Sequence, residues 1–408
     1  IGNFENYIKG PDFHSLMSDL FGNGIFNANG NNWKIQRKTA SHIFNVKNFR
    51  NEFIKTFIQE INYMMEHIWD KAVESKSIID FHDIMYKLTL DSFILLGFGT
   101  NINSLGTKDK IPFAEAFDES QRNIFKRFVN PFWPITEKLI NILMPWRKGM
   151  NSNLKIMNDF AQSIIKKRRE EIKKGETHND LLSRFIRVST VYEAPFSDKE
   201  LRDIILNFII AGRDTTAQAL SWTFYMLISH PTIEAKLFDE IQEYIDDEVL
   251  SDSTQLYETI KKMKYAHAIF YEVLRLYPSV PLNQKFALND DILPDGTPIR
   301  RGECFVWSSY AMGRIEEIWG DDAKQFKPDR WFSDDGNLRH ESQYKWTSFH
   351  AGPRGCLGRD LATLEALATI ILLVRKYRFS LVAGQKITYQ VSLTLPMKYG
   401  MKVAVEKR

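Results

Sequence analysis

The loop at residues 349–358 carries the strongest chemical signal in this sequence of 408 residues. It reads Phe-His-Ala-Gly-Pro-Arg-Gly-Cys-Leu-Gly, so two glycines and a proline precede Cys356. Glycines let a backbone approach a flat partner closely, and a helix that begins just after the cysteine directs N–H groups toward its sulfur. Because Arg354 adds positive charge, the loop predicts a thiolate that binds a metal. The alternative is a buried structural cysteine.

A second unusual segment lies at the centre of a predicted long helix. Ser197 and Glu200 form a capping box that begins this helix near residue 198, and Pro231 begins the next helix. Residues 211–216 read Ala-Gly-Arg-Asp-Thr-Thr, and several of these are poor helix formers. A conflicted centre in a well-capped helix indicates a functional distortion. The alternative is a hydroxyl that bonds back to a helix carbonyl and bends the helix.

Two residue pairs stand at helical spacing. Trp33 and Arg37 are four residues apart, so they share a helix face, and both side chains donate hydrogen bonds of the kind a carboxylate accepts. Glu272 and Arg275 are three apart and are neighbours on a helix surface. Neither pair is specific alone, because a core tryptophan beside a surface arginine, and a surface ion pair, account for them without any function.

Helices must position these residues, because helical periodicity dominates the chain and strand signals gather late. The expected helices include 198–230, 263–277 and 357–377, the last apolar nearly all round and therefore buried. Asp295-Gly296 indicates a hairpin turn, and residues 401–405 a strand. The fold class that follows is mostly α with a minor β part.

The composition excludes several classes of protein. Lys and Arg number 54 against 51 Asp and Glu, a net charge of +3, which argues against a nucleic-acid-binding protein. The 13% of aromatic residues can fill a core, which excludes disorder over most of the chain. With only Cys304 and Cys356, the chain is neither a disulfide scaffold nor a zinc-finger protein. No apolar run reaches the roughly 18 residues of a membrane span.

The pattern F-x-x-G-x-R-x-C-x-G at residues 349–358 resembles the haem-binding loop of the cytochrome P-450 superfamily. The resemblance implies haem b with Cys356 as the axial ligand of its iron, and with Phe349 at the haem. It also implies that Trp33, Arg37 and Arg354 bind haem propionates. His350 and Lys285 are weaker candidates for the same role. Glu272-x-x-Arg275 matches the family's structural lock, which a later arginine, here Arg330, joins.

The same resemblance gives the helix centre a catalytic role. The family's chemistry delivers two protons to dioxygen, so that one oxygen atom leaves as water. The resemblance implies that Thr215 positions a water and relays protons, and that Asp214 is the acid that resupplies them. Gly212 is expected to open a groove in the helix for dioxygen. Thr216 is expected to have a packing role.

The resemblance covers about residues 22–402, and we expect residues 1–408 to form one haem-thiolate monooxygenase domain. Trp33 lies in the family's third lettered helix, so the membrane anchor and the first sheet strands of the usual fold are expected to be absent. For the full-length protein the resemblance implies the endoplasmic reticulum membrane. It implies electrons from an NADPH–cytochrome P-450 reductase, no nucleic acid, and a monomer.

Residues 290–296 and 310–320 resemble the plant and fungal fatty-acid ω-hydroxylases, which implies a lipid-like substrate. Apolar residues expected near the pocket would suit an alkyl chain: Phe208, Ile209, Leu282, Leu393, Leu395 and Met397. They would equally suit a sterol or a terpenoid, and each could be ordinary core. Further alternatives are a haem-thiolate isomerase or dehydratase and a truncated, non-catalytic haem-binding protein.

Overall fold

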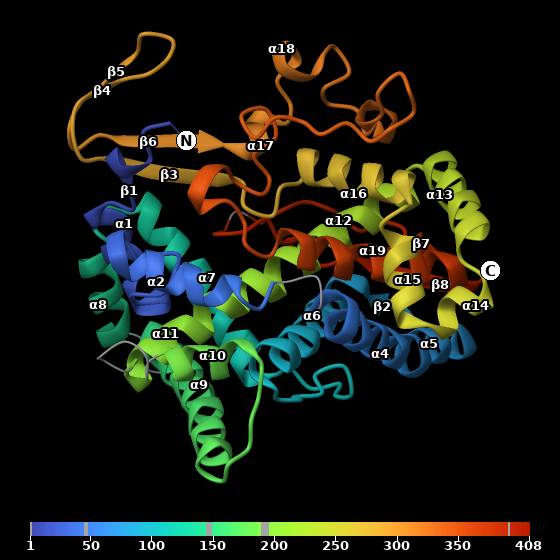
Figure 1. Ribbon diagram of the computed structural model, residues 1–408, viewed down its shortest axis with the longest axis horizontal. Helices are drawn as coiled ribbons and strands as arrows, with labels where there is room; N and C mark the ends of the chain where they lie inside the picture. Colours follow the sequence, from blue (N-terminus) through green and yellow to red (C-terminus); the bar gives the residue numbers. More distant parts are fainter. Residues whose placement is uncertain (1, 45–47, 144–148, 189–195, 391) are drawn as a thin grey trace.

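The structure is a computed structural model that describes residues 2–44, 48–143, 149–188, 196–390 and 392–408. Within these residues helices predominate and short strands form small antiparallel sheets, so the predicted fold class is confirmed (Figure 1). Two sheets lie at opposite ends of the helical body, one beside the N-terminus and one beside the C-terminus (Figure 1).

Helices occur along the whole chain. The α-helices are α1 (Pro11–Phe21), α2 (Gly30–Ser41), α4 (Ile54–Met64), α5 (Asp70–Ser75), α6 (Phe81–Phe98), α7 (Pro112–Val129), α8 (Trp133–Leu143), α9 (Met150–Lys173), α10 (Leu181–Val188), α11 (Asp198–Ile209), α12 (Thr215–Ser229), α13 (Pro231–Tyr244), α14 (Asp247–Ser251), α15 (Ser253–Ile260), α16 (Lys264–Leu276), α17 (Ser309–Met312), α18 (Glu316–Trp319) and α19 (Arg359–Lys376). The π-helical turns are η2 (Phe49–Phe53), η3 (Met65–Trp69) and η4 (Ile210–Asp214), and the 3₁₀ turns are η1 (Phe4–Asn6), η5 (Pro328–Trp331) and η6 (Gly352–Arg354).

The strands are short, and each described pair is antiparallel. One sheet has the order β1 (Tyr7–Ile8), β3 (Leu282–Ala287), β6 (Cys304–Ser308); another has the order β2 (Ile79–Asp80), β8 (Lys402–Lys407), β7 (Tyr377–Leu381); and β4 (Asp291–Ile292) pairs with β5 (Pro298–Ile299). The predicted Asp295-Gly296 turn joins β4 to β5, with Gly296 at φ +88°. β8 confirms the predicted terminal strand.

The long helix expected over residues 198–230 forms three segments. Its capping box is present, because the Ser197 hydroxyl accepts from the Glu200 N–H and the Glu200 carboxylate accepts from the Ser197 N–H. The predicted distortion is also present, as the π-helical turn η4 between α11 and α12. A π turn inserts an extra residue into the helix, and such turns are common at functional sites.

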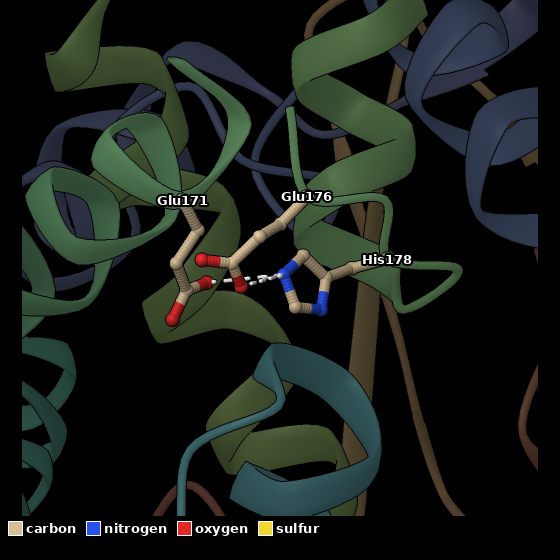
Figure 2. Close-up of side chains that lie close together, drawn as sticks. All are labelled: Glu171, Glu176 and His178. Carbon is tan, nitrogen blue, oxygen red and sulfur yellow. Dashed lines mark ion pairs between the residues drawn. The ribbon is translucent and has the colours of Figure 1, made fainter. Parts of the chain in front are cut away.

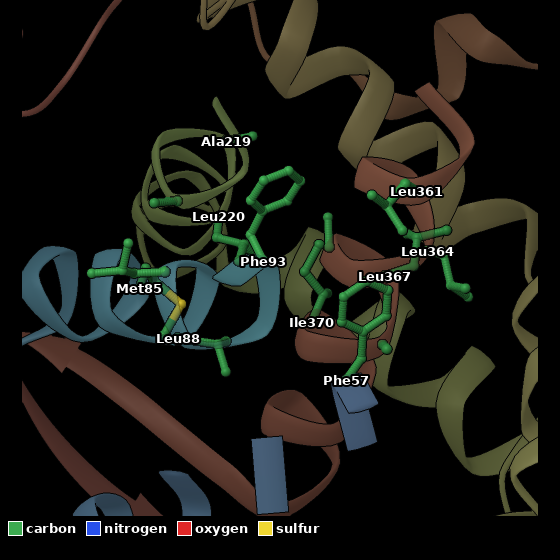
Figure 3. Packing of buried hydrophobic residues seen from close by; sticks show 14 of the residues in the cluster. Phe57, Met85, Leu88, Phe93, Ala219, Leu220, Leu361, Leu364, Leu367 and Ile370 are labelled. Carbon is green, nitrogen blue, oxygen red and sulfur yellow. The ribbon is translucent and has the colours of Figure 1, made fainter. Parts of the chain in front are cut away.

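The core forms where α4, α6, α12 and α19 meet. Figure 3 shows Leu364, Leu367 and Ile370 of α19 packed near Phe57 of α4 and Phe93 of α6. As predicted, residues 366–374 of α19 are all buried. The helix begins two residues later than the expected residue 357, because Gly358 is its N-cap, and it ends at Lys376, where Tyr377 begins β7.

Glu272 is the centre of a buried ion network. Its carboxylate accepts from Nε and Nη2 of Arg275, each at 2.7 Å, and both side chains have no exposed surface. Arg330 Nε donates to the same carboxylate at 2.9 Å and Trp331 Nε1 at 3.0 Å. The backbone N–H of Lys327 donates to it as well, at 2.9 Å. The lock expected among Glu272, Arg275 and Arg330 is therefore present, and it joins α16 to η5.

Glu272→Ala should be strongly destabilising, because it leaves the buried Arg275 guanidinium without a carboxylate and removes one of the two carboxylate partners of Arg330. We expect the free energy of unfolding in urea to fall by about 3–5 kcal/mol. The matched control is Glu258→Ala, which removes the i,i+3 ion pair between Glu258 and Lys261. The side chain of Glu258 is 43% exposed and that of Lys261 is 54% exposed. This control should cost less than about 1 kcal/mol. Equal losses for the two variants would contradict the role given to the network.

Candidate active site

The cysteine loop holds its shape through backbone contacts. The Cys356 N–H donates to the Phe349 carbonyl at 2.8 Å, and Gly352 has φ +64°, a conformation that favours glycine. A Cβ on Gly355 would lie 3.1 Å from the Gly352 carbonyl oxygen, so this position also favours glycine. The Ser348 hydroxyl donates to the Leu274 carbonyl at 2.9 Å, which ties the loop to α16. The loop position therefore depends on the helix that carries the Glu272 network.

Cys356 lines a cavity of about 340 Å³, into which the side chain is exposed. Arg37, Phe349 and His350 line the same cavity, so with Cys356 the structure brings four of the predicted cofactor-binding residues together. Arg359, which was not predicted, also lines it. Burial raises the pKa of the Cys356 thiol, although the Gly358 N–H, Arg37 and Arg359 act in the opposite direction. Burial therefore opposes the thiolate that the loop is expected to favour, whereas the N–H group after the cysteine and the nearby cations favour it. The expected contribution of Arg354 comes instead from Arg37 and Arg359.

Arg354 is held beside the predicted Trp33. Its guanidinium lies 4.6 Å from the Trp33 ring centroid, a cation–π contact, and its Nη2 donates to the Ala28 carbonyl at 2.8 Å. Asn29 Oδ1 accepts from Arg354 at 3.1 Å and from the Lys9 N–H at 2.9 Å. These contacts bring the segment before α2 against the cysteine loop.

Lys9 and Lys285 complete a cluster of cations around Arg354. Lys285 Nζ and Arg354 Nε are buried and have no hydrogen-bond partner among the described residues. Burial, together with repulsion from neighbouring cations, lowers the pKa of Lys285 to about 6, of Lys9 to about 8 and of Arg354 to about 10. His350, at φ +60°, has a pKa lowered to about 4, mainly by burial. Because buried cations need a counter-charge, this cluster fits an anionic ligand.

These residues fit the haem expected from the resemblance. The orphaned nitrogens of Lys285 and Arg354 suit its two carboxylates, and the thiol that faces the cavity suits its iron. Cys356 would hold the iron, while Arg354, Lys285 and Lys9, with Trp33 and Arg37 beside them, would bind the propionates. Lys9 was not identified from the sequence, because nothing in its spacing links it to residues near position 285 or 354.

The helix centre has a different geometry from the one expected for Gly212. A Cβ on Gly212 would lie 1.9 Å from an atom of the Phe93 ring, so α6 occupies the space that the missing side chain leaves. The expectation of an open groove for dioxygen on this side of Gly212 is therefore wrong. Thr215 Oγ1 donates to the Ala211 carbonyl at 2.6 Å, which is the back-bond that the sequence left open as an alternative.

Asp214 is buried, and its carboxylate and the Thr215 hydroxyl hydrogen-bond to different partners. Its carboxylate accepts from Gln121 Nε2 at 2.6 Å and from Arg213 Nη1 at 3.2 Å. Burial raises the pKa of Asp214 to about 6 against the opposing effect of Arg213. Arg213 also pairs with Asp118 at 2.7 Å. Asp214, Arg213 and Asp118 line a polar cavity of about 240 Å³.

Ser279 joins the helix centre to the C-terminal loop. Its hydroxyl donates to the Thr215 carbonyl at 2.7 Å, and its carbonyl accepts from the Leu395 N–H at 3.1 Å. Gln218 Oε1 also accepts from the Leu395 N–H, at 2.9 Å, and Trp222 Nε1 donates to the Leu395 carbonyl at 3.0 Å. These contacts place Leu395 near Thr215. No sequence motif pointed to Ser279, because its role depends on a partner 64 residues away.

A second cluster of potential ligands lies at the end of α9. Glu171, Glu176 and His178 point toward one another, with His178 Nε2 at 3.4 and 3.5 Å from the two carboxylates (Figure 2). Glu171 already accepts from Arg168 Nε at 2.8 Å. The cluster is therefore an ion-paired group at the protein surface, and it belongs to no part of the cysteine site.

Comparison with known proteins identifies relatives over the whole chain. A family model described as Cytochrome P450 matches residues 2–402. Cytochrome P450 86B1 of Arabidopsis thaliana is 38% identical over 99% of this chain and 74% of its own length. Cytochrome P450 704B1 of the same plant is 37% identical over 100% of this chain and 84% of its own. The alkane hydroxylase MAH1 of Arabidopsis thaliana is 34% identical over 100% of this chain and 81% of its own.

Lys285→Met should have opposite effects with and without haem. The pKa of Lys285 is about 6 in the folded chain and the usual 10.5 in the unfolded chain. Between these pH values Lys285 is therefore protonated in the unfolded chain and neutral in the folded one. The stability of the haem-free chain should therefore rise with pH in this range, by up to about 1.4 kcal/mol per unit from this residue. The variant should lose that dependence, be more stable near pH 6, and bind haem more weakly.

The matched control is Lys262→Met, because Lys262 is exposed on the surface. Urea unfolding at several pH values and haem titration would measure both effects. A variant with the same pH dependence and the same haem affinity as the parent chain would contradict the placement of Lys285 in the cation cluster.

Proposed function

Since the chain belongs to the cytochrome P450 family and is therefore a haem-dependent monooxygenase, we propose that it hydroxylates the ω carbon of a long-chain fatty acid. The family and the haem b cofactor predicted from the sequence are confirmed. Haem, when bound at Cys356, supplies the activation of dioxygen. The substrate and the roles of individual residues belong to the proposal.

The relative named an alkane hydroxylase is the observation that carries the substrate class, because an alkane and a fatty acid share an unactivated alkyl chain. Its similarity covers 100% of this chain. Leu395 and Met397, which were expected near the pocket, are buried on the loop that Ser279 ties to Thr215. Phe208 instead packs beside Phe185, with ring centroids 6.2 Å apart, as an ordinary core residue would.

Thr215 and Asp214 are the residues that we propose handle protons. The Thr215 side chain is partly accessible, so its hydroxyl can leave the Ala211 carbonyl and hydrogen-bond to a water. Asp214, with a pKa of about 6, exchanges protons near neutral pH, and it borders a polar cavity. Because the two side chains hydrogen-bond to other partners, proton transfer between them needs a bridging water or a change of rotamer.

The enzyme works with a reductase as its redox partner and with a small-molecule substrate, as its family does. We assign the partner as an NADPH–cytochrome P-450 reductase and the location as the endoplasmic reticulum membrane. We also assign the enzyme as a monomer. All three assignments rest on the family resemblance.

The proposal predicts an ω-hydroxy fatty acid as the product. The haem-loaded chain, the reductase and NADPH would be incubated under labelled dioxygen with a long-chain fatty acid, an alkane or a sterol. Mass spectrometry should find one labelled oxygen atom at the terminal carbon of the acid. Cys356→Ala should lose the thiolate Soret band of the reduced carbon-monoxide complex and all product. Product from the sterol alone, or product without labelled oxygen, would overturn the proposed substrate or reaction.

Thr215→Ala should uncouple NADPH oxidation from hydroxylation, because the hydroxyl that relays protons is lost. We expect NADPH oxidation to continue with release of peroxide, while product formation falls by about a hundredfold. Thr215→Ser should retain coupling. The matched control is Thr216→Ala, at a neighbouring buried position, which should keep the parent ratio of product to NADPH. Full coupling in Thr215→Ala would argue against the proton relay.

A further inference from the structure

Gln218 is a buried polar residue to which the proposed function gives no role. It is fully buried on α12, which lies between α6 and α16 (Figure 1). Its Nε2 donates to the Tyr86 hydroxyl and to Thr394 Oγ1, each at 2.7 Å. Its Oε1 accepts from the Leu395 N–H at 2.9 Å. Because an amide nitrogen carries two N–H groups, both are used, and only one orientation of the amide places its oxygen against the Leu395 N–H.

Thr394 and Leu395 belong to the C-terminal loop, residues 392–398. The Gln390 N–H donates to the Pro396 carbonyl at 2.8 Å, which joins the loop to the segment before it. Thr394 and Leu395 are 4% and 3% exposed, so this part of the loop is packed against the protein. Leu395 is also one of the residues expected from the sequence at the substrate pocket. The position of the loop therefore affects the shape of that pocket.

The amide of Gln218 holds the loop at one distance from α12. Its nitrogen and its oxygen bind two successive residues, so the loop cannot move along the helix without breaking one of the bonds. Ser279 and Trp222 bond only to the backbone of Leu395. Among the residues that the structure describes, Gln218 is the only side chain with a hydrogen bond to both Thr394 and Leu395.

The bond to Tyr86 opposes rotation of the amide. Tyr86 belongs to α6, and the Arg213 guanidinium lies 4.6 Å from its ring centroid. Arg213 is itself held by Asp118 at 2.7 Å and Asp214 at 3.2 Å. Burying an amide costs free energy that an apolar side chain would not cost, but a fully bonded amide permits only one arrangement of its neighbours. Gln218 therefore provides precise placement of the loop.

We propose that Gln218 is a positioning residue that determines which carbon of the substrate is hydroxylated, because it fixes the C-terminal loop that carries Leu395. The C–H bonds of a methyl group are stronger than those of a methylene, so hydroxylation at the terminal carbon depends on position rather than on reactivity. This inference rests on the proposed function, because it requires a substrate with an alkyl chain.

The test compares the products of Gln218→Met with those of the parent. Methionine has a similar length but forms none of the three hydrogen bonds. With the haem-loaded chain, the reductase, NADPH and a long-chain fatty acid, the ratio of ω to ω−1 and ω−2 alcohols should fall by about fivefold or more. Thr394→Val should shift the ratio in the same direction, whereas Thr394→Ser, which keeps the hydroxyl, should retain the parent ratio. An unchanged reduced carbon-monoxide spectrum would show that each variant is folded.

Hydrogen–deuterium exchange tests the placement of the loop without a substrate. In Gln218→Met the Leu395 N–H loses one of its two acceptors, so a peptide that contains residues 392–398 should exchange about tenfold faster. The matched control is Gln36→Met, because Gln36 of α2 is 2% exposed and its amide also donates two hydrogen bonds. This control should leave the exchange of the peptide and the product ratio at their parent values.

The outcomes separate this inference from the proposed function. If the parent forms the ω alcohol and Gln218→Met leaves the product ratio or the exchange of the loop unchanged, the positioning role is overturned and the proposed function stands. An equal shift of the ratio in Gln36→Met would also overturn the role, because loss of any buried amide would then account for it. If the parent forms no hydroxy acid, the proposed function fails, and the assignment of regioselectivity fails with it.

Discussion

The burial of one carboxylate, Glu272, determines where the rest of the active site lies. With no exposed surface, it accepts hydrogen bonds from Arg275, Arg330 and Trp331. Removing this charge from water is costly, and only a full set of donors compensates for it. The set exists only when α16 and η5 lie together, so the network selects one arrangement of these elements. Because Ser348 bonds to the Leu274 carbonyl, the cysteine loop takes its place from the same helix.

The Glu272 network is compensated by its own donors, whereas the cation cluster lacks a counter-charge among the residues that the structure describes. Lys9 lies between β1 and α1, Lys285 on β3 and Arg354 in the cysteine loop, and their charges repel one another. A protein that used these positions only for stability would place apolar residues there. The unfavourable charges are explained by a ligand that carries carboxylates, because its binding energy includes relief of this repulsion. The repulsion between the cations lowers the stability of the haem-free chain. Its relief on binding increases the affinity for the ligand.

The centre of the long helix shows how packing and chemistry share one segment. Gly212 lets the Phe93 ring approach η4, the Asp214 carboxylate accepts from Gln121 of α7, and the Thr215 carbonyl accepts from the Ser279 hydroxyl. The two proposed proton carriers therefore have different surroundings: Asp214 borders a polar cavity, and the Thr215 hydroxyl donates to the Ala211 carbonyl. Adjacent side chains of a helix with 3.6 residues per turn point about 100° apart, so the two groups face different neighbours.

The sequence by itself determined the local features: the capping box at Ser197, the distortion at 210–214, the turn at Gly296 and the cysteine loop, because each depends on neighbouring residues. The resemblance to the family also identified Glu272, Arg275 and Arg330 as one network from the sequence. Only the tertiary structure decided that Lys9 and Ser279 belong to the site, that Phe93 fills the space at Gly212, and that burial raises the pKa of the Cys356 thiol. Burial and long-range contacts arise from the whole fold, and no local pattern encodes them.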